Sequence, residues 1–124
     1  MITKCTVLVV EDNDALREMF RRRLSRRGYN VELAVDGEEG LVKAADIEPD
    51  IILLDMSLPG KNGWTIASEL KSESLTNKIP VIAITAHAMR GDRERALQVG
   101  CDDYVSKPIN FNLLFASMDR LQRQ

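Results

Sequence analysis

The chain has 124 residues, of which 44% are hydrophobic and 29% are charged, and its 17 Lys and Arg against 19 Asp and Glu leave a formal net charge of -2. This length is close to that of one folding domain, so we expect residues 1–124 to form a single domain with its own hydrophobic core. The composition excludes a disordered, collagen-like or coiled-coil protein. The small net charge argues against direct DNA binding, because DNA-binding domains usually carry a basic excess.

The first apolar run, Val7–Val10, is followed at once by Glu11 and Asp12. This run is too short for the core of a signal peptide or for a membrane span, so we expect a cytoplasmic protein without membrane contact. Cys5 and Cys101 form no CxxC pair, and we expect both to be buried thiols in a protein without a structural metal.

Five short apolar runs predict β-strands. Three of them, VLVV, IILL and VIAI, are continuously apolar rather than alternating. Such runs are typical of strands that are covered by helices on both faces. The predicted strands are Thr6–Val10, Asn30–Ala34, Asp50–Leu54, Val81–Thr85 and Asp103–Ser106.

Amphipathic segments between the strands predict helices. In the first, Asn13 is the predicted N-cap and Gly28 the predicted terminator. Asp36, with Glu39 three residues later, predicts a capping box that begins a second helix through Ala45. The apolar residues of the first helix recur at the spacing of one helix face, at Leu16, Met19, Phe20 and Leu24.

Three further helices are predicted downstream. One is Gly63–Leu70, and a weaker one is about Arg90–Val99 and stops at Gly100. Asn110 is the predicted N-cap of the last helix. Five strand and helix pairs in succession predict a parallel sheet with right-handed crossovers, and hence a doubly wound α/β domain. The apolar side of the last helix is formed by Phe111, Leu114, Phe115, Met118 and Leu121.

Polar residues stand at the ends of the predicted strands, which is where ligands bind in sheets of this kind. Glu11 and Asp12 follow the first strand, and Asp55 follows the third. Thr85 ends the fourth strand, and Lys107 follows the fifth. If the strand order is 2-1-3-4-5, the first and third strands are neighbours and the three carboxylates converge in one pocket.

Three neighbouring carboxylates repel one another, and a divalent cation removes that repulsion. Mg²⁺ suits this donor set because it takes one or two protein carboxylates and keeps waters that a phosphate displaces. Lys107 would supply a positive charge and Thr85 a hydroxyl for a phosphoryl oxygen. A carboxylate nucleophile with these neighbours indicates formation of an aspartyl phosphate.

Four segments, VLVVEDN, DIILLDMSLPGKNG, VIAITA and DDYVSKP, resemble in order and spacing the receiver domain of two-component response regulators. The resemblance covers essentially the whole chain and is closest in kind to a stand-alone regulator of the chemotaxis type. It implies a flavodoxin-like fold: a five-stranded parallel sheet in the order 2-1-3-4-5 with five helices, in three α/β/α layers.

The resemblance also implies roles for the acidic residues. Asp55 is the implied phosphoacceptor, which takes its phosphoryl group from a sensor histidine kinase or a histidine phosphotransfer protein. Asp12, Asp55 and the Ser57 backbone carbonyl are the implied Mg²⁺ ligands, and Glu11 acts mostly through a bound water.

A switch is implied by the same resemblance. Lys107 pairs with the phosphoryl group, and the Lys107–Pro108 bond is cis in the family. Thr85 is the implied switch hydroxyl, and Tyr104 is the aromatic residue that follows it inward. The implied output surface is the fifth strand with the fourth and fifth helices. It would bind an unidentified protein target, and the protein would be a monomer or a phosphorylation-dependent dimer.

Some residues keep two interpretations. Ser57 and His87 lie two residues after Asp55 and Thr85, at positions that tune the phosphoryl lifetime in the family, but His87 also fits a solvent-facing loop. Tyr104 also fits a static, half-buried strand residue. The arginines at positions 21–23, 26 and 27 form either a solvated helix face or a docking patch for an acidic kinase surface.

Two other functional classes are poorly supported. An aspartyl-phosphate phosphatase normally needs a second acid two residues after its nucleophile, where this chain has Ser57. A flavodoxin-like nucleotide binder needs a glycine-rich loop after the first strand, where this chain has EDND. We therefore expect a phosphoacceptor switch that catalyses only its own phosphotransfer and autodephosphorylation.

The place of this switch in a pathway stays open between two alternatives. One is a terminal output, and the other is a phosphorelay intermediate that passes phosphate to a histidine phosphotransfer protein. The four motifs and the last helix use nearly all of the 124 residues, so we expect the output to be contact with another protein, unless the chain is an excised piece of a larger one.

Overall fold

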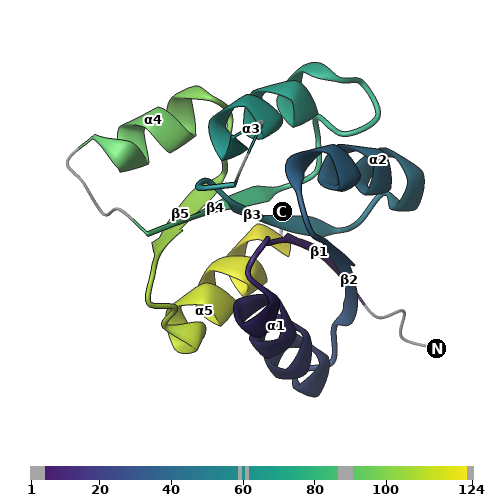
Figure 1. Ribbon diagram of the computed structural model, residues 1–124, viewed down its shortest axis with the longest axis vertical. Helices are drawn as coiled ribbons and strands as arrows, with labels where there is room; N and C mark the ends of the chain where they lie inside the picture. The colour runs from purple at the N-terminus through teal and green to yellow at the C-terminus, as the bar shows by residue number, and fades with distance from the viewer. Residues whose placement is uncertain (1–4, 59, 61, 87–90, 123–124) are drawn as a thin grey trace.

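The computed structural model describes residues 5–58, 60, 62–86 and 91–122. Within these residues five strands alternate with five helices, as the sequence predicts (Figure 1). In chain order the elements are β1 (Thr6–Val10), α1 (Asp14–Arg26), β2 (Asn30–Ala34), α2 (Gly37–Ile47), β3 (Ile51–Asp55), α3 (Gly63–Ser72), β4 (Val81–Thr85), α4 (Asp92–Gln98), β5 (Asp103–Ser106) and α5 (Phe111–Gln122).

The strands of the described chain form one parallel sheet in the order β2-β1-β3-β4-β5. Helices α1 and α5 cover one face of the sheet, and α2, α3 and α4 cover the other (Figure 1). The flavodoxin-like fold, its three layers and its strand order are thus as expected. The chain winds outward in opposite directions from the pair β1 and β3, and their carboxyl ends form the switch point of the sheet.

Side chains of the central strands alternate between two hydrophobic cores. Val7 and Val9 of β1 pack in one cluster with Phe20 of α1. Leu8 and Val10 of the same strand belong to the cluster on the opposite face, with residues of α2 and α3. The strands β3 and β4 are likewise buried at every residue. Burial on both faces explains why these strands are continuously apolar rather than alternating.

The predicted caps begin three of the helices. Oδ1 of Asn13, Asp36 and Asn110 accepts a hydrogen bond from the backbone N–H three residues later, at 2.8, 2.9 and 3.1 Å respectively. Glu39 reaches back to the backbone N–H of the residue before Asp36, at 2.7 Å, and so completes a variant of the predicted capping box. Gly28 follows α1 with a φ of 101°, as its predicted terminating role requires.

The third strand is shifted by one residue from the prediction. It is Ile51–Asp55 rather than Asp50–Leu54. The Asp50 carboxylate lies ahead of the strand, where Oδ2 accepts a hydrogen bond from the backbone N–H of Thr6 at 2.7 Å. Asp55 is therefore the last residue of the strand, and the sheet itself holds its backbone.

Other differences concern helix ends and exposure. Helix α3 continues to Ser72, two residues beyond its predicted end. Helix α4 begins at Asp92, and the predicted start at Arg90 lies outside the described residues. Cys101 is buried as expected, whereas Cys5 precedes β1 and is only half-buried. Within the part of the chain that the structure describes, no helix has both the length and the apolar character to cross a membrane.

Two arginines at the end of α1 pack on aromatic rings of α5. The guanidinium carbon of Arg23 lies 4.2 Å from the centroid of the Phe111 ring, and that of Arg27 lies 4.4 Å from the centroid of the Phe115 ring. Arg27 also pairs with Asp119 at 3.1 Å. These two side chains therefore join neighbouring helices, which is a role that neither interpretation of the arginine run predicts.

The start of α3 lies so close to the end of β3 that only a glycine fits at position 63. A Cβ atom on Gly63 would lie 2.4 Å from the Cα of Met56 and 2.6 Å from the carbonyl oxygen of Asp55. Asn62 caps the same helix by accepting a hydrogen bond from the backbone N–H of Thr65 at 3.0 Å. The helix start is thus held against the backbone that carries Asp55.

We predict that Gly63→Ala destabilises the protein by about 2 kcal/mol or more, because the added methyl group has to displace backbone atoms. Urea unfolding followed by Trp64 fluorescence measures the change. Ser68→Ala, at an exposed position of the same helix, is the control and should change stability by less than about 0.5 kcal/mol. Equal midpoints for the two variants would contradict the close approach.

Candidate phosphorylation and metal site

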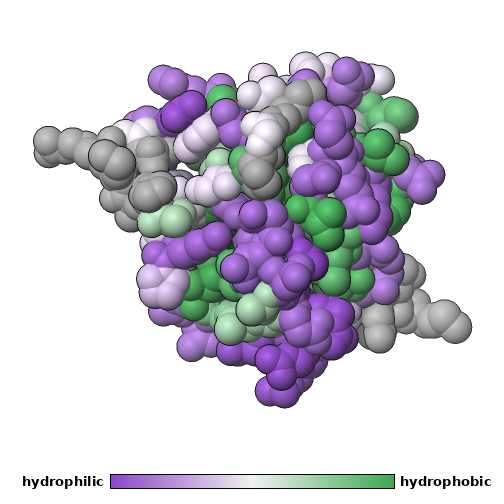
Figure 2. Space-filling model, viewed as in Figure 1, coloured by the Kyte–Doolittle hydropathy of each residue, from purple (hydrophilic) through white to green (hydrophobic). Residues whose placement is uncertain are grey.

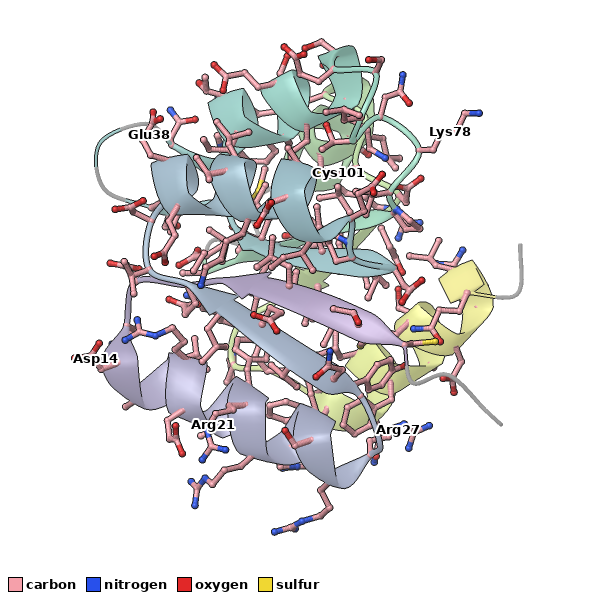
Figure 3. All side chains as sticks on the ribbon, turned by 90° about the vertical axis from the view of Figure 1, so that its right-hand side faces the viewer. Asp14, Arg21, Arg27, Glu38, Lys78 and Cys101 are labelled. Atoms are coloured by element: carbon pink, nitrogen blue, oxygen red, sulfur yellow. The ribbon has the colours of Figure 1, made fainter. Side chains whose placement is uncertain are left out.

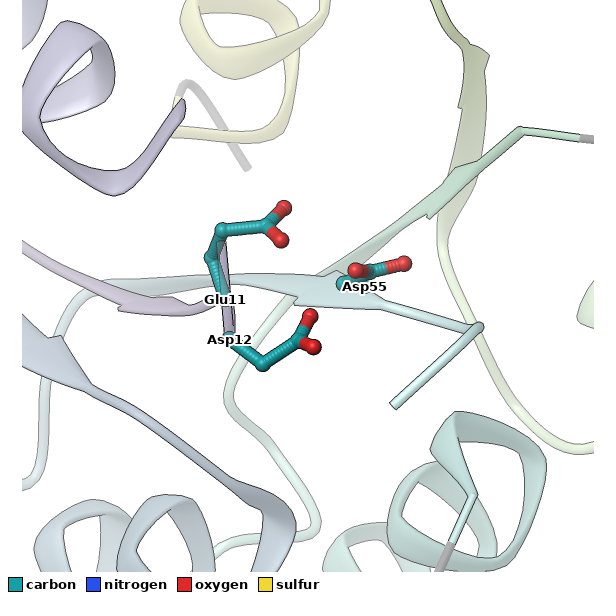
Figure 4. Close-up of side chains that lie close together, drawn as sticks. All are labelled: Glu11, Asp12 and Asp55. Atoms are coloured by element: carbon teal, nitrogen blue, oxygen red, sulfur yellow. The ribbon is translucent and has the colours of Figure 1, made fainter. Parts of the chain in front are cut away.

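The ends of β1 and β3 bring three carboxylates together. Val10 pairs with Leu54 in the parallel register, so the next residues, Glu11 and Asp55, lie side by side. Carboxylate oxygens of Glu11, Asp12 and Asp55 all lie within 4.8 Å of one another (Figure 4). We call these three residues the acidic cluster. Its position at the switch point is the one expected from the strand order.

Asp55 is oriented by contacts to both of its carboxylate oxygens. The side chain is buried, with only 3% of its surface exposed. Its Oδ1 accepts a hydrogen bond from the backbone N–H of Ser57 at 2.9 Å, and its Oδ2 accepts one from the Lys107 ammonium at 3.3 Å. The lysine comes from the segment after β5, so a charge-assisted bond joins two strand ends that are not neighbours in the sheet.

Glu11 lies deeper than the other members of the acidic cluster and is 1% exposed. Its Oε2 accepts a hydrogen bond from the backbone N–H of Asn13 at 3.2 Å. Its Oε1 is 3.5 Å from Lys107 Nζ but accepts no hydrogen bond from the described residues. Arg17 of α1 donates a hydrogen bond to the Glu11 carbonyl at 2.9 Å and so fixes the backbone at this point.

Burial of the Glu11 carboxyl, and next the negative charge of Asp55, raise the pKa of Glu11 from 4.5 to about 7. The Asn13 N–H and the Lys107 ammonium act in the opposite direction but are the weaker influences. One lysine thus does not compensate the burial and negative charge of this pocket, and the Glu11 carboxyl titrates near neutral pH when no other cation is bound.

The acidic cluster has the properties of a divalent-cation site. The Glu11 Oε1 atom is buried, lacks a hydrogen bond from the described residues and lies near oxygens of Asp12 and Asp55. Asp12 is exposed, so the cluster is open to solvent on that side. Hard oxygen donors with excess negative charge and an open side fit Mg²⁺, because this ion keeps several waters.

Thr85 and Lys107 lie beside each other across β4 and β5. Thr85 pairs with Ser106, and the carbonyl of Thr85 accepts a hydrogen bond from the backbone N–H of Lys107 at 2.7 Å. Thr85 is buried and comes one residue after Ile84, the β4 partner of Asp55. Tyr104 pairs with Ala83 and is half-buried against the core on the α2, α3 and α4 face.

The structure describes two of the remaining predicted features, Ser57 and the Lys107–Pro108 bond, but not His87. The Ser57 side chain is exposed beside the buried Asp55. The peptide bond between Lys107 and Pro108 is cis, as the resemblance implies. His87 lies outside the described residues. The roles of Ser57 and His87 in metal binding and phosphoryl lifetime stay predictions.

Two supporting residues were missed by the sequence reasoning. Arg17 holds the Glu11 backbone, but a polar residue on an amphipathic helix carries no signal for such a contact. Gly63 allows α3 to approach Asp55. The start of this helix at Gly63 was predicted, but no local pattern indicated its close approach to the backbone of Asp55.

Comparison with known proteins identifies relatives of the whole chain. Residues 7–119 match the family model of the response regulator receiver domain. The chain is 42% identical over 117 residues to the response regulator PleD of Caulobacter vibrioides, which covers 94% of this chain and 26% of PleD, so this chain spans about a quarter of that relative. It is also 42% identical over 105 residues to the polar-differentiation response regulator DivK of Brucella anthropi, with 85% of each chain covered.

A solved structure with the same fold contains a bound metal ion. The receiver domain of the sensor histidine kinase PA1611 from Pseudomonas aeruginosa matches with a TM-score of 0.90 and 33% identity, covering 98% of this chain and 100% of that chain. A magnesium ion is coordinated in the active-site cleft of that domain. The family model, the relatives and the fold agree: the chain belongs to the response regulator receiver family of two-component signal transduction.

Proposed function

We propose that Asp55 accepts a phosphoryl group from a phosphohistidine on a sensor histidine kinase or a histidine phosphotransfer protein. The observation that carries this proposal is the position of the Asp55 carboxylate, buried in the acidic cluster and 3.3 Å from the Lys107 ammonium. Receiver domains act as phosphoacceptor switches. Here the carboxylate nucleophile lies next to a positively charged ammonium, which stabilises the negative charge of the phosphoryl group during transfer.

In the transfer, one Asp55 oxygen forms a bond to phosphorus while the bond between phosphorus and the donor imidazole breaks, and the imidazole leaves with the electron pair. The Ser57 N–H and the Lys107 ammonium orient the carboxylate before the reaction. Lys107 then pairs with a phosphoryl oxygen, and the Thr85 hydroxyl donates a hydrogen bond to another.

Asp12, Asp55 and the Ser57 backbone carbonyl would hold Mg²⁺ directly, and Glu11 would act through a bound water. The bound cation would offset the negative charge of the carboxylates and of the phosphoryl oxygens. The buried Glu11 Oε1, without a hydrogen bond from the described residues, supports this assignment.

The switch would run from Thr85 and Tyr104 to the face formed by α4, β5 and α5. A phosphoryl group adds about -1.5 to -2 units of charge and three acceptor oxygens, which favour the state with Thr85 turned toward it. A groove of about 310 Å³ between β5 and α5, lined in part by Tyr104 and by the exposed Leu113, offers a contact surface for the protein target.

The phosphodonor would dock beside Lys107. Leu16 and Met19 of α1, with Pro108 and Ile109, line an apolar groove of about 310 Å³ that Lys107 also borders. A donor histidine has to approach Asp55 from this open end of the sheet, so the groove is where donor side chains would be buried. This role also accounts for Met19, which was expected on the buried side of α1 but is 42% exposed.

Several finer points belong to the same proposal. Ser57 and His87 would control the lifetime of the phosphoryl group, and the protein would act in the cytoplasm as a monomer or a phosphorylation-dependent dimer. Measurement of the phosphoryl lifetime, and of phosphoryl loss to a histidine phosphotransfer protein, separates a terminal output from a relay intermediate.

The phosphoacceptor assignment predicts that Asp55→Asn abolishes the adduct formed with acetyl phosphate and Mg²⁺. In the wild-type protein, intact-mass measurement should show one acid-stable, base-labile phosphoryl group. The exposed carboxylate Asp46→Asn is the matched control and should be phosphorylated normally. An adduct that survives in Asp55→Asn would place the phosphoacceptor elsewhere.

The raised pKa of Glu11 predicts a pH dependence of stability in EDTA. The unfolded carboxyl ionises through pH 4.5 and the folded one through about pH 7. The contribution of Glu11 to stability is therefore most favourable below pH 4.5 and falls by about 3 kcal/mol as the pH rises to 7.

Urea unfolding of the wild type and Glu11→Gln across this pH range isolates the effect, because Gln does not titrate. The unfolding free energy of the wild type, relative to that of Glu11→Gln, should fall as the pH rises from 4.5 to 7. Mg²⁺ should restore wild-type stability above pH 7. A difference that is constant with pH would contradict the raised pKa.

The docking groove predicts that Met19→Glu slows phosphorylation by a histidine kinase but not by acetyl phosphate. A charge in the groove opposes burial of donor side chains, whereas a small molecule reaches Asp55 without it. Leu75→Glu, at an exposed leucine away from α1, is the matched control and should leave both rates unchanged. Equal slowing with both donors would indicate damage to Asp55 itself.

A further inference from the structure

A groove between α2 and α3 has no part in the phosphorylation chemistry. It has a volume of about 400 Å³. Its apolar lining comes from Leu41 and Ala45 of α2, Leu70 of α3 and Leu75 of the following loop. Val42, the next residue of α2 after Leu41, is 68% exposed. Figure 2 shows hydrophobic atoms that reach the surface over α2 among hydrophilic ones.

The loop after α3 presents Leu75 to solvent in a fixed position. Leu75 is 63% exposed, yet the next residue, Thr76, is buried and donates a hydrogen bond to the Leu70 carbonyl at 2.6 Å. The backbone N–H of Asn77 donates to the carbonyl of Glu73 at 2.9 Å. A leucine held outward by an ordered loop loses little conformational entropy when a partner covers it.

The rim of the groove is acidic, with Glu69 and Glu73 among its lining residues. Both helices also end on this side, so their C-terminal carbonyls add partial negative charge. Helix α2 has no basic residue in its last turn. The Lys71 ammonium at the end of α3 is engaged with the Ile79 carbonyl at 2.7 Å and with Asp102 at 3.0 Å.

The groove lies at the opposite end of the sheet from the acidic cluster. Helices in parallel α/β folds run antiparallel to the strands, so their C-termini lie at the amino ends of the strands. In Figure 3, Glu38 near the start of α2 and Asp14 at the start of α1 lie on one side, and Lys78 in the loop after α3 lies on the other. A molecule in the groove would leave the approach to Asp55 open.

We propose that this groove binds a basic amphipathic helix of a partner protein, with the apolar side chains of that helix between α2 and α3 and its Lys or Arg residues against Glu73 and the C-terminal carbonyls of α2 and α3. The acidic rim disfavours nucleic acid and anionic membranes. A second copy of this chain fits less well, because the apolar residues Phe20 and Leu24 of its arginine-rich helix α1 are buried. The proposal does not depend on phosphorylation of Asp55.

The test uses a synthetic helical peptide with Leu at every third or fourth position and Lys on the flanking positions, titrated into the full-length protein and followed by amide NMR shifts. Saturable shifts should be confined to α2, the end of α3 and the loop that carries Leu75. Leu75→Glu and Glu73→Lys should each weaken binding by about tenfold or more. Met19→Glu, at a similarly exposed apolar residue on another face, should leave binding unchanged.

Two further measurements separate this proposal from its alternatives. A peptide with Glu in place of Lys should not bind, and the Lys peptide should bind equally to the protein with and without acetyl phosphate and Mg²⁺. Absence of saturable shifts, or equal loss of binding in Leu75→Glu and Met19→Glu, would overturn the proposal. Self-association in sedimentation that Leu75→Glu removes would assign the groove to a second copy instead.

Discussion

Lys107 faces two buried carboxylates, and the properties of the site depend on that imbalance of charge. Its ammonium lies 3.3 Å from Asp55 and 3.5 Å from Glu11, while Asp12 adds a third acidic group at the mouth. Burial of the Glu11 carboxyl raises its pKa, and the charge of Asp55, which the single lysine does not neutralise, raises this pKa further. A pocket with this residual negative charge favours a divalent cation and is sensitive to any group that changes its charge.

Packing on both faces of the sheet stabilises this unfavourable arrangement. Carboxylates that repel one another stay together because their backbones continue β1 and β3, and every residue of β3 is buried. Helix α3 adds a second constraint, since Gly63 lies against the backbone of Asp55 and Met56. On the other face, Arg23 on the Phe111 ring joins α1 to α5. The site thus draws its rigidity from the packing around the backbone that carries its carboxylates.

The fold also separates the surfaces that partners would use. The groove beside Lys107 is next to Asp55, the groove along β5 lies near Tyr104, and the groove of Leu75 lies at the opposite end of the sheet. The first two grooves adjoin at Pro108, whereas a basic helix in the groove of Leu75 would contact a different part of the chain. Binding in the groove of Leu75 would thus leave both of the other grooves open.

Much of the architecture was predictable from local patterns. Continuous apolar runs predicted strands buried on both faces, and the caps Asn13, Asp36 and Asn110 were found because their hydrogen bonds involve residues three positions away. The end of β3 was misplaced by one residue, because Asp50 bonds to Thr6 of another strand and no local pattern encodes that bond.

The sequence by itself determined the class of the fold, the caps and the polar residues at the strand ends, since periodicity, capping and chain order are local properties. Only the tertiary structure decided which groups meet. Glu11 is buried next to Lys107, and Arg23 stacks on the ring of Phe111. These contacts join segments that lie up to about a hundred residues apart in the sequence. Burial and proximity of this kind exist only once the chain has folded, and they set the charge balance of the site.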